Sequence, residues 1–142
     1  MNRYTYEEIT IGQTERFSVT VTQQMQDDFR KITGDLNPLH ADAAYAASHG
    51  HKGPVVFGML TLSFLSTLAG MYLPGERSLI HETEGKLRRP VYIGDELTIE
   101  GTVSDKSDAV HVITVKYTIT NQDGVKVARG QMQIGVEGEG NG

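Results

Sequence analysis

Cysteine and long apolar runs are both absent from this chain of 142 residues. Without cysteine there are no disulfides, no thiolate metal ligands and no cysteine nucleophile. No apolar run approaches the roughly 20 residues that a membrane-spanning helix needs. The polar first residues also lack the apolar core of a signal peptide. We therefore expect a cytoplasmic protein without a membrane span, formed by a single domain over residues 1–142.

Positive charge is also scarce, because 13 Lys and Arg stand against 18 Asp and Glu and the formal net charge is −5. No basic field would offset the repulsion of phosphates, so we expect no binding to nucleic acid. The one concentrated basic cluster is Lys86-Leu87-Arg88-Arg89. We take Lys86 and Arg88 as candidate binding residues for an anionic substrate. The alternative is that this cluster is an ordinary solvated strand face.

The order of periodic segments predicts an α+β fold. A strand is expected over 14–22, a helix over 23–33 that Gly34 ends, and a short helix over 42–48. Residues 58–72 are apolar on nearly every face, which is typical of a buried helix. Strands are expected over 78–91, 96–103, 109–121 and 125–136, and a disordered tail over 136–142. This order suits the hot-dog fold, in which an antiparallel sheet wraps around one central helix.

The stretch from Gly34 to His40 holds an acid and a histidine five residues apart, joined by a turn that Pro38 stiffens. Acid–base catalysis needs two such groups held toward one point. Asn37 can fix the shape of the loop by bonding its own backbone. An isolated Asp and His at this spacing are common, however, and more often mark a helix-terminating turn with a surface histidine. Whether Asp35 and His40 are catalytic must therefore be judged from the residues around them.

Three blocks of residues supply those surroundings. They are Gly34-Asp35-x-Asn37-Pro38-Leu39-His40-x-Asp42 with Tyr45-Ala46, then Gly53-Pro54-Val55-Val56-x-Gly58-Met59-Leu60, then Arg89-Pro90-Val91-Tyr92-Ile93-Gly94-Asp95-Glu96-Leu97. In their order and spacing they closely resemble the MaoC-like dehydratases, a group that includes the (R)-specific enoyl-CoA hydratases. The resemblance runs from about residue 14 to residue 136, which makes it far more specific than a single motif.

The resemblance implies a hot-dog domain, normally dimeric, that acts on thioesters of coenzyme A or of a carrier protein. The implied reaction is the reversible hydration of a trans-2-enoyl thioester to an (R)-3-hydroxyacyl thioester, with no cofactor and no metal. Asp35 and His40 would be the catalytic pair that holds one water and moves protons to and from the substrate. Asn37 is taken as a substrate-binding residue of the same loop.

Gly58 begins the buried helix, where unpaired N–H groups and the positive end of the helix dipole could stabilise a charged thioester oxygen. Its alternative role is close packing of the helix on the sheet. Ser66 matches a serine that lines the family's site, and Leu65 and Ala69 are further candidates to border the acyl pocket. One departure is Phe57, since many relatives carry a histidine there. The change bears on the polarity of the site and the choice of substrate.

Other functions remain open from the sequence. A hot-dog thioesterase commonly uses an acid on or beside its central helix, but residues 58–72 contain no Asp, Glu or His. A non-catalytic acyl-thioester-binding domain and a purely structural dimer would also be compatible with this fold. The two histidines of His49-Gly50-His51 lack a nearby acid, so they are a weak metal motif. A thin sheet around one helix leaves an exposed edge, for which reason we expect a homodimer or a higher homo-oligomer.

Overall fold

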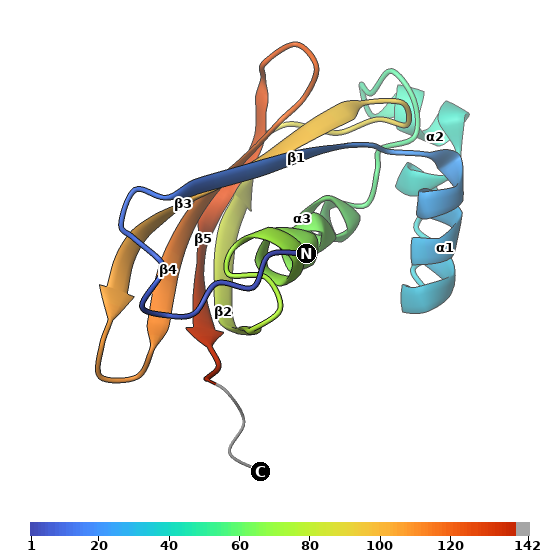
Figure 1. The fold of residues 1–142 in the computed structure, drawn as a ribbon. Coiled ribbons are helices and arrows are strands. Elements are labelled where there is room, and N and C mark those ends of the chain that lie inside the picture. The colour runs from blue at the N-terminus through green and yellow to red at the C-terminus, as the bar shows by residue number, and fades with distance from the viewer. Residues whose placement is uncertain (139–142) are drawn as a thin grey trace.

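Five antiparallel strands form the sheet that carries the fold (Figure 1). The computed structural model describes residues 1–138. The strand order is β1-β3-β4-β5-β2, and each neighbouring pair is antiparallel. β1 and β2 are therefore the two edges. The strands are β1 (Thr14–Thr20), β2 (Ser78–Leu87), β3 (Glu96–Ser107), β4 (Val112–Thr120) and β5 (Lys126–Val136).

The central helix α3 (Gly58–Thr67) lies inside the curve of this sheet, and one turn of π-helix, η2 (Leu68–Tyr72), continues it (Figure 1). The strands turn every second side chain toward it, as the 2.0-residue period of a strand requires. In β4 the alternate residues from Ile113 to Ile119 are all buried. Side chains from α3, η2 and the sheet form one hydrophobic core, which confirms the predicted hot-dog architecture.

Three short helical segments lie outside the sheet and α3, on the side where α3 begins (Figure 1). They are α1 (Gln23–Thr33), the 3-10 turn η1 (Pro38–His40) and α2 (Ala43–Ser48). Side chains cap the two α-helices: Thr22 accepts a bond from Met25 N, and Asp42 accepts one from Tyr45 N. Gly34 ends α1 in the left-handed region, at φ 73°. Short polar residues are favoured at the N-terminal end of a helix, and glycine is favoured directly after its C-terminal end.

The structure confirms the predicted elements and moves some of their ends. β2 stops at Leu87 rather than continuing to residue 91, and β4 begins at Val112 rather than at residue 109. Val136 was assigned to a disordered tail, but it is the last residue of β5 and is 4% exposed. The remainder of that predicted tail, residues 139–142, lies outside the described residues. Within residues 1–138 no helix is long and apolar enough to cross a membrane.

Candidate functional site

A cavity of about 240 Å³ opens where the start of α3 meets the end of β2. Three of the predicted site residues, His40, Gly58 and Arg88, line it together although they are far apart in the sequence. Its other lining residues are Val55, Val56, Thr61, Leu87, Arg89, Pro90 and Val91. The cavity therefore joins the end of the motif loop, the first turn of the buried helix and the segment that follows β2.

The imidazole of His40 is held in one orientation and in one tautomer. Its Nδ1 lies 2.7 Å from the carbonyl oxygen of Val55. Because a carbonyl oxygen can only accept, Nδ1 carries the hydrogen, and in the neutral ring Nε2 keeps its lone pair. The ring also packs against Phe57, with ring centroids 4.1 Å apart. This arrangement presents Nε2 as a base, which is the form that proton abstraction from water requires.

Gln26, on the buried side of α1, ties together the segments that carry the site. It is 1% exposed. Its Nε2 donates to the carbonyl oxygens of His40 and Val55, each at 3.1 Å, and its Oε1 accepts from Phe57 N at 3.2 Å. Sequence reasoning missed this residue. The available signal was a glutamine on the same helix face as Met25 and Phe29, where an apolar side chain is expected.

The loop that carries Asp35 is shaped by its own side chains. Asp35 Oδ1 accepts a bond from Asn37 N, and Asn37 Oδ1 accepts one from Leu39 N, both at 3.0 Å. These two successive Asx turns direct the chain into η1 and so to His40. Asp35 and Asn37 are both exposed, and neither lines the cavity that contains His40. The structure thus brings together His40 and Gly58, while Asp35 lies in the surface loop that leads to them.

Gly58 begins α3 without a side-chain cap, since the preceding residue is Phe57. The carbonyl oxygen of Phe57 accepts from the N–H groups of Leu60 and Thr61. Within residues 1–138 no hydrogen bond engages the N–H of Gly58. A Cβ at this position would lie 2.5 Å from Leu87 Cδ1, so the glycine also permits the end of β2 to pack closely on α3. The close-packing role therefore has a structural basis, and the oxyanion role stays a prediction.

The residues predicted to border the acyl chain lie deeper along the helix. Leu65 and Ala69 are 4% and 0% exposed and belong to the hydrophobic core, whereas Ser66 is exposed on another side. None of the three lines the cavity with His40. The side chain of α3 that does so is Thr61, which the sequence pattern did not single out. The role of the three in acyl binding stays a prediction.

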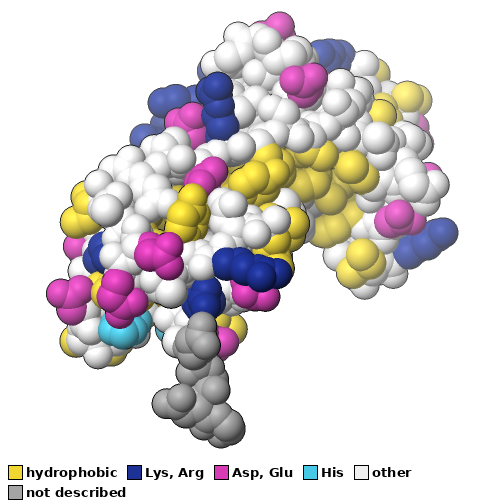
Figure 2. Space-filling view, viewed as in Figure 1, with side chains coloured by type: hydrophobic (Ala, Val, Ile, Leu, Met, Phe, Trp, Pro, Cys, Tyr) yellow, Lys and Arg dark blue, Asp and Glu magenta, His cyan; other side chains and the backbone are white. Residues whose placement is uncertain are grey.

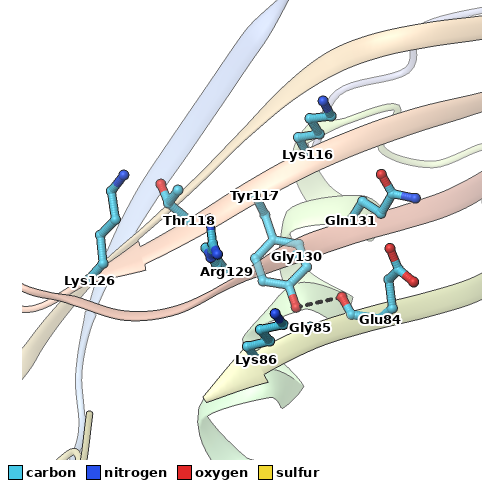
Figure 3. A pocket seen from close by; sticks show the side chains of 10 residues that line it. All are labelled: Glu84, Gly85, Lys86, Lys116, Tyr117, Thr118, Lys126, Arg129, Gly130 and Gln131. Carbon is cyan, nitrogen blue, oxygen red and sulfur yellow. Dashed lines mark hydrogen bonds between the residues drawn. The ribbon is translucent and has the colours of Figure 1, made fainter. Parts of the chain in front are cut away.

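Six cations gather on a surface next to the cavity, here called the cationic face. Its members are Lys86, Arg88, Arg89, Lys116, Lys126 and Arg129. A hollow of about 570 Å³ contains Arg88 and Arg89, which also line the His40 cavity, together with Lys126 and Arg129. Those last two border a further hollow of about 550 Å³ on β2, β4 and β5 (Figure 3). The three hollows therefore adjoin one another.

One acid, Glu84, lines the same hollow as Lys86, Lys116, Lys126 and Arg129, so cations outnumber acids on the cationic face. Within residues 1–138, none of its six members takes part in a salt bridge. Lys86 lies directly opposite Arg129 in the register of β2 and β5. Like charges at such a position repel, so the arrangement costs stability unless an anion is bound. Lys86 and Arg88, the two predicted binding residues, are both part of this surface.

The third motif block forms the far wall of the site. Val91 carbonyl oxygen accepts from Val56 N at 2.8 Å, which ties this block to the segment before α3. Asp95 is 8% exposed; its Oδ2 accepts from Tyr92 N at 2.9 Å and its Oδ1 from Gln122 Nε2 at 3.0 Å. Asp95 thus fixes the turn that leads into β3, and its role in the structure is to hold the loop.

Comparison with known proteins agrees with this geometry. Residues 7–124 match the family model described as MaoC like domain. The chain is 32% identical over 126 residues to an (R)-specific enoyl-CoA hydratase of Aeromonas caviae, covering 89% of this chain and 94% of that protein. It is 30% identical over 115 residues to an (R)-specific enoyl-CoA hydratase of Rhodospirillum rubrum, with 81% and 80% covered.

Solved structures give the same result. The (R)-hydratase from A. caviae involved in PHA biosynthesis superimposes with a TM-score of 0.88 at 30% identity, covering 92% of this chain and 99% of that one. The R-hydratase PhaJ1 from Pseudomonas aeruginosa also gives a TM-score of 0.88 at 30% identity, with 95% and 86% covered. The residues that match the family model include the motif loop, the central helix and the segment after β2. The chain belongs to the MaoC-like dehydratase family.

Proposed function

We propose that the protein is a hydro-lyase that reversibly hydrates a trans-2-enoyl thioester to an (R)-3-hydroxyacyl thioester. The observation that carries the proposal is the placement of His40 in a cavity with the free N–H of Gly58. The bond from Nδ1 to the carbonyl oxygen of Val55 leaves Nε2 as the basic nitrogen. A base and an oxyanion donor in one cavity are the two elements that addition to an enoyl thioester needs.

In the proposed mechanism, His40 and Asp35 together hold one water molecule against C3 of the substrate. As the water oxygen bonds to C3, one of the pair takes a proton from it and the π electrons of the C2–C3 bond move toward the thioester carbonyl. The N–H of Gly58 stabilises the negative oxygen that results. The proton taken from the water passes through the pair and is delivered to C2, so the pair ends in the protonation state in which it began. We treat the two as a coupled unit and do not divide the steps between them. Dehydration follows the same steps in reverse.

The cationic face supports coenzyme A as the carrier of the acyl group. Coenzyme A bears several phosphate charges at the end of a long flexible arm. The hollows that lead from His40 past Arg88 and Arg89 to Lys126 and Arg129 provide a route for such an arm. Arginine and lysine are the residues that bind phosphate in proteins. The role of Lys86 and Arg88 as substrate-binding residues is part of this proposal.

The proposal includes a homodimer, in which a second copy pairs with β2 and covers the exposed side of α3. β2 is an edge strand of 10 residues that pairs with β5 alone, and long open edges of this kind invite pairing with another chain. Figure 2 shows hydrophobic side chains gathered between the strands and the outer helices. Exposed apolar residues of α1, the motif loop, α3 and β2 include Ile32, Leu36, Met59, Leu79, Ile80 and Leu87. Leu36 adjoins Asp35, so a partner that covers it would also shield the catalytic loop from water.

The test is an activity panel with crotonyl-CoA and longer enoyl-CoA substrates. We expect loss of the enoyl absorbance, an (R)-3-hydroxyacyl product and no release of free thiol. Thiol release without hydration would instead assign the protein to the thioesterases. Binding of the substrates without turnover would identify a non-catalytic acyl-thioester domain. Sedimentation at micromolar protein concentration tests the dimer, and a monomer there would contradict it.

A further inference from the structure

Thr61, in the first part of α3, has a buried hydroxyl group without a partner. Its side chain is 1% exposed, and Oγ1 is the one buried side-chain polar atom of residues 1–138 with no hydrogen bond. A helical Ser or Thr usually relieves such a deficit by bonding the carbonyl oxygen four residues earlier. Ser63 does so with Met59 at 2.7 Å, and Thr33 does so with Phe29 at 3.0 Å. Thr61 does not, and an unsatisfied buried hydroxyl destabilises the folded state.

The position of Thr61 relates this hydroxyl to the proposed reaction. Thr61 lines the cavity with His40 and Gly58. It follows Gly58 by three residues and so lies on the same face of the helix. Side chains in an α-helix lean toward its N-terminus, which brings the hydroxyl over the turn that begins at Gly58. The free hydroxyl of Thr61 therefore lies over the helix turn whose first N–H, that of Gly58, is also free.

We propose that Thr61 Oγ1 donates a second hydrogen bond to the thioester oxygen, beside the N–H of Gly58. This inference rests on the proposed function. When water adds to C3, the displaced π electrons place negative charge on that oxygen, and both donors stabilise it until C2 is protonated. Thr61 gives up no proton in this step; its hydroxyl hydrogen stays on oxygen throughout. The bond strengthens as charge develops, so its main effect is on the transition state.

The unsatisfied hydroxyl then has a functional reason. A polar residue whose partner is the substrate has no partner when the substrate is absent. The substrate-free protein is then less stable than it would be with an apolar residue of the same shape. Valine has that shape and lacks the hydroxyl. The Thr61→Val variant should therefore separate stability from activity, since it removes a cost to folding and a contribution to catalysis in one change.

The experiment compares Thr61→Val and Thr61→Ser with the wild type, with Thr67→Val as the matched control on the same helix but outside the cavity. We expect Thr61→Val to lower kcat by about 100-fold, which is typical for loss of one oxyanion donor. KM should change little and the melting temperature should be equal or higher. Thr61→Ser should retain most of the turnover because it keeps the hydroxyl, and Thr67→Val should match the wild type.

Two results would overturn the inference. One is wild-type turnover in Thr61→Val, which would show that the hydroxyl does not act on the substrate. The other is equal loss of turnover in Thr61→Ser and Thr61→Val together with a lower melting temperature in both, which would indicate a packing role. A wild type that does not hydrate enoyl thioesters refutes the proposed function. An active wild type with an equally active Thr61→Val refutes only the role of Thr61.

Discussion

Replacing Gln26 by methionine should loosen the segments that hold the catalytic histidine. Methionine has a similar length but can form none of the three hydrogen bonds of Gln26. The carbonyl oxygen of Val55 would keep its bond from His40, and that of His40 would keep a 3.4 Å bond from Arg30 Nη2. The N–H of Phe57, a residue 3% exposed, would lose its partner altogether.

The expected loss of stability follows from these contacts. A buried N–H left without a partner costs about 1–3 kcal/mol, and each further lost bond about 1 kcal/mol. We therefore expect the free energy of unfolding to fall by roughly 3–5 kcal/mol, which corresponds to a fall of about 10–15 °C in melting temperature. Hydratase turnover at a temperature where the variant is folded should also fall, because Gln26 bonds the backbone of His40 directly.

Thermal unfolding followed by circular dichroism measures the first effect, and initial rates with crotonyl-CoA measure the second. Gln24→Met is the matched control, since Gln24 is on the same helix but is exposed and bonds only Asp28 of its own helix. This control should stay within about 2 °C of the wild type, as surface substitutions usually do. A melting temperature of Gln26→Met within about 2 °C of the wild type would refute the reasoning.

Two further predictions concern the core and the alkaline range. Ala69 is fully buried, so Ala69→Leu should overpack the core and lower the free energy of unfolding by about 1–3 kcal/mol. A stable variant that selectively loses activity on long acyl chains would instead place Ala69 at the acyl pocket. Burial, together with the 2.6 Å hydrogen bond that Tyr6 donates to Asp108, raises the pKa of Tyr6 from 10.0 to about 12. The folded state then retains a proton that the unfolded state loses, so stability is full below about pH 10 and falls as the pH rises toward 12. Tyr6→Phe should flatten that alkaline fall in the free energy of unfolding, and an unchanged slope would contradict the assignment.

Local signals explain why much of the fold was predictable. The bounds of α1 were predicted correctly, and the local signal for its C-terminal end was Gly34, which acts directly at that end. The buried helix was recognisable because residues 58–72 are apolar on nearly every face. The end of β2 was placed too late because Arg88 and Arg89 continue the polar pattern, whereas their N–H groups both turn to the carbonyl oxygen of Val127. The early end of β2 depends on a contact with β5, which is distant in the sequence, so the residues around Arg88 do not indicate it.

The site was less predictable than the fold, because much of it depends on contacts between distant segments. His40 and Gly58 were selected from their motif, and the structure places both in one cavity. Gln26 and Thr61 carry no motif, because their importance arises from contacts between segments that only the folded chain brings together. Asp35 is exposed in the single chain. Its surroundings depend on what covers the loop, and residues within one copy of the chain cannot determine that.

The proposed catalytic loop is tested most directly by the turnover of crotonyl-CoA in Asp35→Asn and His40→Gln, with the melting temperature of each variant. Asparagine keeps the shape of Asp35 and its capacity to accept the bond from Asn37 N, but it cannot take a proton. We expect turnover to fall by about 10²–10⁴-fold in each variant while the melting temperature stays close to that of the wild type. The double variant should be little worse than the worse single one, because the pair acts as a unit. Near-normal turnover in Asp35→Asn would contradict the account and leave this loop a structural turn.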